Sequence, residues 1–332
     1  MDSNDCVLVL GSSSFAGGVF IDECLKQNFE VIGVSRSEEK SQFFKPYSDN
    51  SKISNFSFHK YDINKDFVPL INLIDSVRPR YIIDFAGQGM VAPSWEMPWQ
   101  WYQTNLVAKS KLISHLSAAN YSLRYVRIST PEVYGNSSNE LFENTDYAPS
   151  TPYAISHTAI DLHLESMKHY KGFDCVIGRF ANFYGPSQQL YRIIPRTILS
   201  ILNGSKLPLH GGGLSRRAFI HGTDVARGIL QMMTKGESGS KYHFTNYDYV
   251  SIRGLVEVIC NKLGVDFAKS VTIVGDRLGK DRDYKMNDDW TSSSLGWSPC
   301  VSLDTGLDEC ITKIRKNLQE LSNLPLEYIH KE

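Results

Sequence analysis

Short apolar runs alternate with longer amphipathic segments along the first half of the chain. Such apolar runs predict buried parallel strands, and helical spacing of apolar positions predicts the helices between them. The expected strands are 6–11, 29–36, 57–63, 81–87, 124–130 and the start of 173–186. The expected helices are 17–28, 68–79, 99–120 and one that carries Tyr153 and continues to about residue 170. This alternation predicts an α/β fold with a Rossmann-type doubly wound parallel sheet.

The alternation loosens after about residue 185. Helices are expected at 192–204, 222–236, 251–264 and 303–321, while 206–221 is rich in glycine and then strand-like. We therefore expect residues 1–185 to form the sheet domain, with some later segments returning to it. Residues 186–332 should form mainly a smaller C-terminal lobe.

Composition and charge narrow the classes of protein to consider. The chain has 332 residues, 42% hydrophobic and 21% charged, so it can bury a sizeable core. A net charge of −1 with no basic patch or stripe argues against a nucleic-acid partner. No apolar run approaches the ~18 residues of a membrane span, and no cleavable leader is recognisable. Six cysteines without a C-x-x-C pair indicate buried thiols in a reducing cytoplasm and no metal site.

The stretch GSSSFAGG, residues 11–18, lies between the first expected strand and the first expected helix. Gly11 and Gly17 take the outer positions of a G-x-x-G-x-x-G loop, and Ser14 takes the middle one. A tight turn of this kind lets backbone N–H groups bind a pyrophosphate at the positive end of a helix. Its position between strand and helix favours nucleotide binding over a purely structural turn.

The end of the second expected strand bears on the choice of cofactor. A carboxylate there would bind the ribose 2′-hydroxyl of NAD, but this chain has Ser35 and Arg36. An arginine can hold a 2′-phosphate, so NADP is favoured over NAD, unless Arg36 is only a solvated surface residue. Asp62 would cap the adenine pocket or is an ordinary turn aspartate. The candidate dinucleotide contacts are Gly11, Ser13, Ser14, Phe15, Ala16, Gly17, Ser35, Arg36, Asp62, Ile63, Phe85, Ala86, Gly87, Tyr153 and His157.

Several further stretches together resemble one protein family over nearly the whole chain. They are ISTPEVYG (128–135), YAPSTPYAISHTAID (147–161), RFANFYGP (179–186), LHGGGLSRRAFIHGTDVARGI (209–229) and DRLGKDRDY…LGW (276–297). With the glycine loop, their order and spacing resemble the extended short-chain dehydrogenase/reductase family. Within it, the chain looks most like the nucleotide-sugar 4,6-dehydratases, which include dTDP-glucose and GDP-mannose dehydratases. The resemblance implies a nucleotide-diphosphate sugar as substrate, a sugar-nucleotide-binding C-terminal lobe and a homodimer paired through two helices per subunit.

The resemblance also implies catalytic roles. Thr130 would bind the C4 oxygen of the sugar, and Tyr153 would remove the C4 hydroxyl proton while hydride leaves C4 for the nicotinamide. Glu132 would then abstract the C5 proton, which the 4-ketone has made acidic, and the hydride would return to C6 after the C6 hydroxyl departs. A helix cap or a surface glutamate is the alternative for Glu132. The expected substrate contacts are Gln88, Ser94, Thr130, Asn182, Arg192, Arg217 and Arg282.

His157 departs from the family pattern. It stands four residues after Tyr153, so both share one helix face, but the family has a lysine there. That lysine stays charged, binds the nicotinamide ribose and lowers the pKa of the tyrosine. A histidine with an ordinary pKa of ~6.5 would be charged only about a quarter of the time at neutral pH. His157 would partly activate Tyr153, or be passive beside the nicotinamide's own charge, or mark lost redox chemistry; a lysine in its place is expected to retain or increase activity.

Pro131 is the second departure. The dTDP-glucose branch has an aspartate at this position that protonates the departing C6 hydroxyl, and proline has no such group. Glu132 would then have to act as base and as acid in turn. A nucleotide-sugar epimerase, an NADPH-dependent 4-ketoreductase of the same family and a non-catalytic sensing fold therefore remain as alternatives to the dehydratase.

Overall fold

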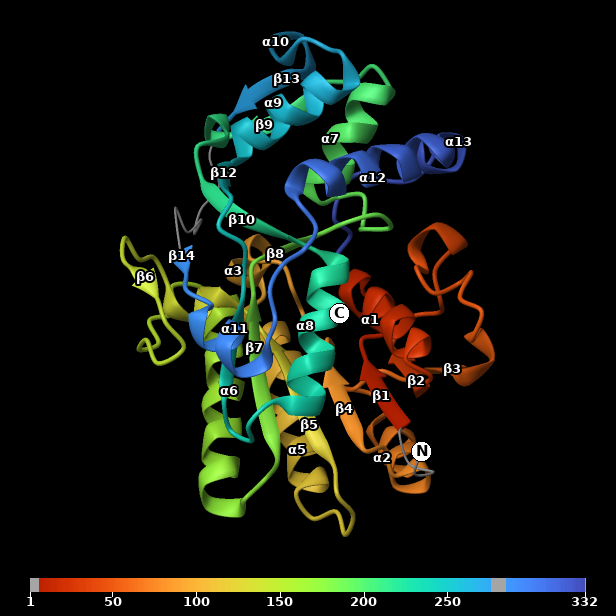
Figure 1. The fold of residues 1–332 in the computed structure, drawn as a ribbon, viewed down its shortest axis with the longest axis vertical. Coiled ribbons are helices and arrows are strands. Elements are labelled where there is room, and N and C mark those ends of the chain that lie inside the picture. The colour runs from red at the N-terminus through yellow and green to blue at the C-terminus, as the bar shows by residue number, and fades with distance from the viewer. Residues whose placement is uncertain (1–5, 276–284, 332) are drawn as a thin grey trace.

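The protein, described here by a computed structural model, is seen over residues 6–275 and 285–331. Seven parallel strands form one sheet in the order β11-β7-β5-β4-β1-β2-β3. The strand order reverses beside β1, which confirms the predicted doubly wound α/β sheet (Figure 1). The strands are β1 (Cys6–Leu10), β2 (Glu30–Ser35), β3 (Phe56–Lys60), β4 (Tyr81–Asp84), β5 (Arg124–Ser129), β7 (Cys175–Phe180) and β11 (Lys241–Phe244).

Helices cover both faces of this sheet because its strands are apolar on both sides. In β1, Val7 and Val9 join the core under α1 (Phe15–Lys26) and α8 (Gly222–Lys235). The alternate residues, Leu8 and Leu10, join the core on the opposite face. There they pack with residues of three other helices, α2 (Phe67–Val77), α5 (Lys109–Leu116) and α6 (Pro152–Lys171).

The expected helix 99–120 is divided into three parts, so that prediction is only partly right. It consists of α4 (Pro98–Tyr102), the π-helical segment η3 (Gln103–Ala108) and α5, which ends at Leu116. Within the π segment the buried Asn105 accepts a hydrogen bond from the Gln88 backbone and donates to Ser156 at 3.0 Å. The π-helical segment therefore contains the side chain, Asn105, that connects the loop after β4 to α6 by hydrogen bonds.

The C-terminal lobe lies above the carboxyl ends of the strands, at the top of Figure 1. Its core is formed by apolar residues of α7 (Ile193–Leu202), α9 (Ile252–Leu263) and α12 (Leu303–Lys316). In the sequence, α8 and β11 lie between α7 and α9, and both of them belong to the sheet domain. The remaining strands are β6 (Glu140–Leu141), β8 (Asn182–Tyr184), β9 (Leu207–His210), β10 (Arg216–His221), β12 (Tyr249–Ser251), β13 (Val271–Val274) and β14 (Lys285–Met286). The remaining helical segments are η1 (Gln42–Phe44), η2 (Ile53–Asn55), α3 (Ala92–Glu96), η4 (Pro131–Tyr134), η5 (Gly211–Gly213), α10 (Phe267–Ser270), α11 (Asp289–Leu295) and α13 (Leu318–Leu321).

Over residues 6–275 and 285–331, every helix is too short or too polar to cross a bilayer.

Candidate active site

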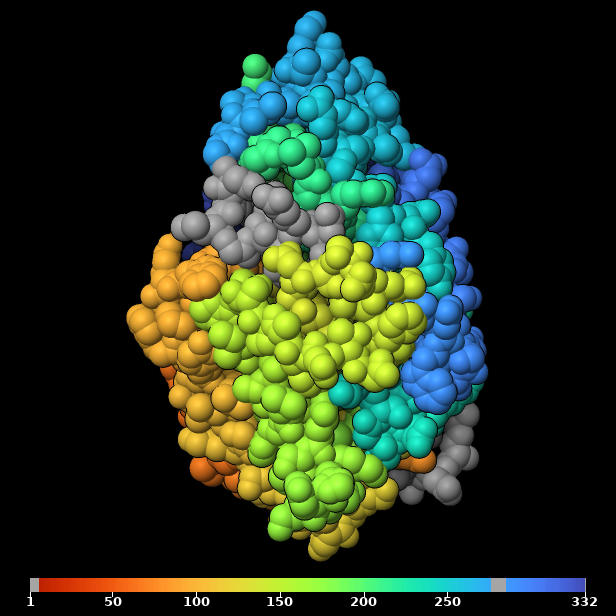
Figure 2. Space-filling view, turned by 90° about the vertical axis from the view of Figure 1, so that its left-hand side faces the viewer, coloured from red at the N-terminus to blue at the C-terminus, as the bar shows by residue number. Residues whose placement is uncertain are grey.

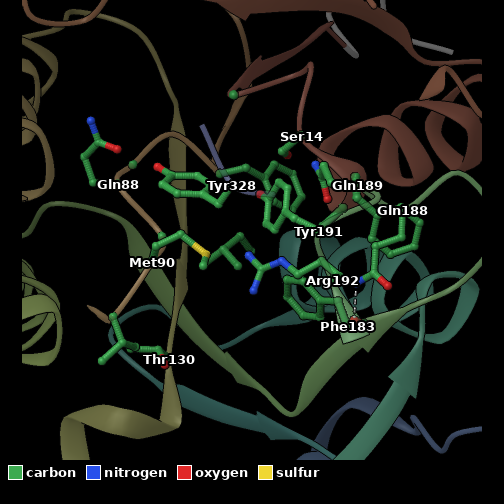
Figure 3. Close-up of a pocket in the computed structure, with 18 of the residues that line it drawn as sticks. Ser14, Gln88, Met90, Thr130, Phe183, Gln188, Gln189, Tyr191, Arg192 and Tyr328 are labelled. Atoms are coloured by element: carbon green, nitrogen blue, oxygen red, sulfur yellow. Dashed lines mark hydrogen bonds between the residues drawn. The ribbon is translucent and has the colours of Figure 1, made fainter. Parts of the chain in front are cut away.

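A cavity of about 950 Å³ lies between the carboxyl ends of the strands and the C-terminal lobe (Figure 3). This is where ligands bind in open α/β sheets. Most of the residues singled out in the sequence line it: Gly11, Ser13, Ser14, Phe15, Ala16, Ser35, Arg36, Asp62, Ile63, Phe85, Ala86, Gly87, Gln88, Thr130, Glu132, Tyr153, His157, Asn182, Arg192 and Arg217. Gly17 and Ser94 lie behind this surface, and Arg282 is outside the described residues.

The glycine loop makes a tight turn between β1 and α1. Gly11 has φ +78°, and a Cβ there would lie 2.7 Å from the backbone nitrogen of Ala86. Ser14 is the N-cap of α1, and its Oγ accepts a hydrogen bond from the backbone N–H of Gly17 at 3.0 Å. Because the Ser14 hydroxyl faces its own helix, the start of α1 stays ordered while neighbouring backbone lines the cavity.

Cations gather at the end of the cavity next to β2. Arg36 and Lys40 both line it, as does Lys331 from the C-terminus. The Nζ atom of Lys331 donates to the Ser37 hydroxyl at 3.4 Å. Burial lowers the pKa of Lys40, and the charge of Lys331 lowers it further. Asp62 lies nearby, where it accepts a hydrogen bond from the Asn64 backbone and so also serves as a turn residue.

Tyr153 is placed by the start of α6. The Thr151 hydroxyl caps this helix by accepting from the Ala154 N–H at 3.1 Å, and proline follows the cap. Tyr153 and His157 then lie one turn apart, with ring centroids 4.5 Å from each other. Ser94 supports the arrangement from behind, because its hydroxyl accepts from the Tyr153 backbone N–H at 3.2 Å.

Thr130 and Glu132 reach the same place from the end of β5. The Thr130 hydroxyl caps η4 by accepting from the Glu132 N–H at 3.3 Å. The pKa of Tyr153 is raised by burial and by the charge of Glu132, while a hydrogen bond from Thr130 acts in the opposite direction. A phenol, a hydroxyl and a carboxylate therefore converge on one wall of the cavity. Such a set can remove a proton from an alcohol and then one from a neighbouring carbon.

The opposite wall comes from the lobe. Asn182 opens β8, Arg192 precedes α7, and Arg217 lies on β10. All three line the cavity, and the Arg192 guanidinium lies 5.3 Å from the ring centroid of Tyr191. Two arginines on the lobe side of the cavity form a surface that suits a diphosphate.

The NAD dependent epimerase/dehydratase family profile matches residues 7–247. The chain belongs to this family. It is 27% identical over 346 residues to the dTDP-glucose 4,6-dehydratase of Shigella flexneri, covering 96% of this chain and 95% of that one. It is 28% identical over 326 residues to the dTDP-D-glucose 4,6-dehydratase of Mus musculus, covering 96% and 90%. A dTDP-glucose 4,6-dehydratase structure from Streptomyces venezuelae with NAD bound has a TM-score of 0.86 and 28% identity, covering 95% and 98%.

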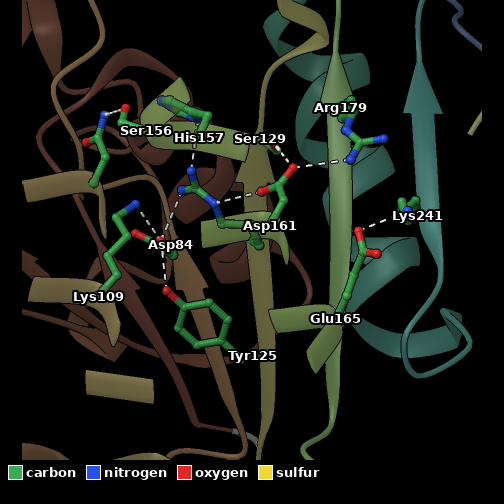
Figure 4. A network of polar contacts seen from close by, with 12 residues as sticks. Asp84, Lys109, Tyr125, Ser129, Ser156, His157, Asp161, Glu165, Arg179 and Lys241 are labelled. Atoms are coloured by element: carbon green, nitrogen blue, oxygen red, sulfur yellow. Dashed lines mark hydrogen bonds and ion pairs between the residues drawn. The ribbon is translucent and has the colours of Figure 1, made fainter. Parts of the chain in front are cut away.

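Arg127 is a site residue of this family member that the sequence analysis missed. Its guanidinium donates from Nη2 to His157 Nδ1 at 2.9 Å and from Nη1 to Asp84 Oδ2 at 3.1 Å. Figure 4 labels both of these partners. Burial lowers the pKa of His157 well below its ordinary value, and the charges of Arg127 and Lys109 lower it further. The structure therefore favours a neutral His157 over the expected partly charged one, because the ring is buried and its neighbour Arg127 is a permanent cation. The signal available in the sequence was an arginine inside a stretch, 124–130, that is expected to form a strand of the sheet.

The C-terminal tail is the other feature that the sequence did not reveal. Tyr328, Ile329 and Lys331 line the cavity, and Tyr328 is seen beside Tyr191 in Figure 3, with ring centroids 5.2 Å apart. The Lys331 carbonyl accepts from Gln88 Nε2 at 2.8 Å. The tail thus contacts both the sheet domain and the lobe at the cavity.

Among the residues described, no group of three or more histidine, cysteine, aspartate or glutamate side chains could hold a metal ion.

Proposed function

We propose that the protein is a nucleotide-sugar 4,6-dehydratase that uses a nicotinamide dinucleotide and returns it unchanged. The observation that carries the proposal is the convergence of Thr130, Glu132 and Tyr153 on the cavity that the glycine loop also lines. Support comes from relatives named dTDP-glucose 4,6-dehydratase, which match nearly the whole chain.

In this proposal each step is assigned to a side chain at the end of β5 or the start of α6. A bound dinucleotide would supply a hydride acceptor at C4 and later a hydride donor at C6. Tyr153 takes the proton of the C4 hydroxyl, whose oxygen Thr130 holds. Glu132 takes the C5 proton, made acidic by the ketone, and passes it to the departing C6 hydroxyl, because Pro131 has no proton to give. After the hydride has returned to C6, C5 takes up a proton from water through Glu132, and Tyr153 releases the proton that it took from the C4 hydroxyl. The product is a 4-keto-6-deoxy sugar nucleotide and one water.

The cavity fits the dinucleotide. Gly11 lets the glycine loop pack against the backbone of Ala86, and residues of that loop, of the start of α1 and of the segment after β4 line one side of the cavity. We propose that a 2′-phosphate is preferred, so that NADP binds more tightly than NAD, because Arg36 and Lys40 lie at the ribose end. Lys331 adds a third positive charge there. The relatives of known structure bind NAD, so the two cofactors must be compared directly.

We also propose how the substrate is held. Arg192 and Arg217 would bind the diphosphate, with Asn182 beside them. Gln88 would lie near the sugar, and Arg282 would add a further diphosphate contact from outside the described residues. Ser94 would act indirectly, by holding the backbone of Tyr153.

A homodimer is proposed from the outer face of α4, η3 and α6, which lie side by side (Figure 2). Four apolar side chains on it are exposed: Trp99, Val107, Ile155 and Leu162. An apolar patch on paired helices is typical of a subunit interface. We place the protein in the cytoplasm, since five of the six cysteines are buried free thiols, which suits a reducing compartment.

The test is a panel of sugar nucleotides with different bases, in which product mass and NADPH absorbance are read together. A product lighter by one water, with no net change in the cofactor, is expected. An unchanged mass would replace the dehydratase with an epimerase, and stoichiometric NADPH consumption would replace it with a ketoreductase. Binding without turnover of any substrate would indicate a sensing fold.

A further inference from the structure

The surroundings of Tyr153 disfavour its ionised form. To accept a proton from an alcohol it must first become a phenolate, and the ordinary pKa of tyrosine is ~10. Burial and the Glu132 carboxylate both raise its pKa further. His157 supplies no compensating charge, because its own pKa is lowered by burial and by Arg127. A positive charge must therefore reach Tyr153 from elsewhere.

A buried ionic network begins directly behind His157. Lys109 donates to Asp84 Oδ2 at 2.6 Å, and Arg127 donates to the same oxygen. Arg127 also lies 3.6 Å from Asp161, which pairs with Arg179 on its other side at 3.2 Å. All five side chains are at most 1% exposed, and all lie within the described part of the chain. Three are cations and two are anions, so these five side chains together carry one surplus positive charge.

The geometry also fixes the protonation of His157. A guanidinium has only donors, so the Arg127 hydrogen bond at 2.9 Å makes His157 Nδ1 an acceptor. The ring proton of the neutral imidazole must then be on Nε2. His157 lines the cavity beside Tyr153, which leaves Nε2–H as a donor for a ligand hydroxyl.

We propose that Arg127 and His157 divide between them two tasks, charge and hydrogen bonding, that a single lysine performs in relatives. Arg127 is the positioning residue: it adds a fixed charge that favours the Tyr153 phenolate, and it locks the tautomer of His157. His157 is the neutral donor that binds the ribose hydroxyl of the dinucleotide. This inference rests on the proposed function for the role of Tyr153, but the tautomer is a property of the protein alone.

Other charged groups surround the pair and are part of the expectation. Asp84 on β4 and Asp161 on α6 hold Arg127 in place, and Lys109 on α5 adds to the surplus charge. Glu132 after β5 opposes the phenolate, and Arg192 before α7 favours it. Removing the charge of Arg127 therefore weakens the phenolate without abolishing every cation nearby.

The first experiment reads the tautomer without any substrate. Nitrogen-15 NMR of labelled imidazoles is recorded from pH 5.5 to 9, and His157→Asn identifies the signal. We expect a neutral ring with the proton on Nε2 across the whole range. A His157 that titrates near its ordinary pKa of ~6.5, or that carries its proton on Nδ1, would overturn the inference.

The second experiment reads the charge through the pH dependence of turnover. In Arg127→Gln the acidic limb of kcat should move up by about one pH unit, so activity at pH 7 falls about tenfold. Arg127→Lys keeps the charge and should recover most of this loss. Tyr125→Phe is the matched control, because Tyr125 donates to Asp84 at 2.8 Å but adds no charge and does not touch His157. It should lower stability while leaving the limb in place, and a shift equal to that of Arg127→Gln would overturn the role of the charge.

A third experiment moves the positive charge from residue 127 to residue 157. The buried guanidinium reverses the expectation for His157→Lys, because the new ammonium would lie against Arg127. The single variant should lose activity, whereas His157→Lys combined with Arg127→Gln should regain it, since one cation again serves Tyr153. Failure of the double variant to exceed the His157→Lys single would contradict the inference. Lack of turnover in the wild type, with the tautomer as expected, would instead contradict the proposed function.

Discussion

Replacing Asp84 by asparagine tests whether the network behind the site is as tightly paired as its distances imply. Asp84 is fully buried and receives hydrogen bonds from Lys109 at 2.6 Å, Arg127 at 3.1 Å and the Tyr125 hydroxyl at 2.8 Å. Burial alone would raise its pKa, but the charges of Lys109 and Arg127 hold the pKa below its usual range. Asparagine keeps the size of the side chain and removes only the charge.

The variant is expected to lose stability, because Lys109 and Arg127 stay buried while the anion that pairs with both of them is removed. Breaking a buried ion pair costs about 3–5 kcal/mol, and asparagine can still accept one hydrogen bond, so the lower end applies. At roughly 2 °C per kcal/mol for a chain of this size, Tm should fall by about 6 °C. A carboxyl whose folded pKa is lowered stabilises the fold above its unfolded pKa of ~3.9. The difference between wild type and variant should therefore be constant near neutral pH and shrink as pH falls below ~4.

Calorimetry at several pH values measures this difference, with urea unfolding as a second estimate. Asp75→Asn is the matched control, because its carboxylate pairs with His115 at the surface and is 54% exposed. The control should change stability by less than about 1 kcal/mol. Adding Lys109→Met to Asp84→Asn should recover part of the loss, since it removes the unpaired cation. A Tm of Asp84→Asn within the error of wild type, or no recovery in the double variant, would refute this account of the network.

Three other outcomes follow from the site. Glu132→Gln should still oxidise C4, so NADPH absorbance should build up transiently without dehydrated product; dehydration at the parent rate would exclude Glu132 as the C5 base. Arg36→Asp should weaken NADP binding about tenfold relative to NAD, as measured by fluorescence titration, and an unchanged ratio would place the 2′-phosphate elsewhere. Deleting residues 327–332 should speed release of the bound dinucleotide in stopped-flow displacement, because this tail contacts both walls of the cavity; an unchanged rate would show that the tail does not retain it.

Local chemistry explains why the sheet and the glycine loop could be predicted from the sequence. Each of these strands is buried on both faces of the sheet, so nearly every position in it must be apolar. This requirement can be read from the sequence without knowing which residues pack against the strand. Gly11 is likewise required by its own positive φ and by the close approach of Ala86. Such requirements leave a direct trace in the residue type at one position.

The parts that could not be predicted depend on contacts between distant residues. The π-helical segment accompanies Asn105, whose partners are Gln88 and Ser156 in other elements. Arg127 looks like a charged interruption of a strand until Asp84 and His157 are placed beside it. The spacing of residues along the chain carries no information on contacts between such distant side chains. His157 could therefore be recognised as a departure from the family pattern, but its charge state could not be predicted.

The surplus positive charge of the network can be removed by loss of a proton from either of two side chains, and the two deprotonations compete. Lys109 can lose its proton, and burial and the charge of Arg127 lower its pKa to about 8. Tyr153 can lose its proton instead, at the cavity end of the same network. Each loss removes the electrostatic reason for the other, so the two protons are coupled and an observed pH limb belongs to the pair. Near neutral pH Lys109 still keeps most of its charge, and that charge is then available to favour the phenolate. A neutral histidine beside a permanently charged arginine is therefore compatible with an active tyrosine, and the missing lysine is not by itself a sign of lost chemistry.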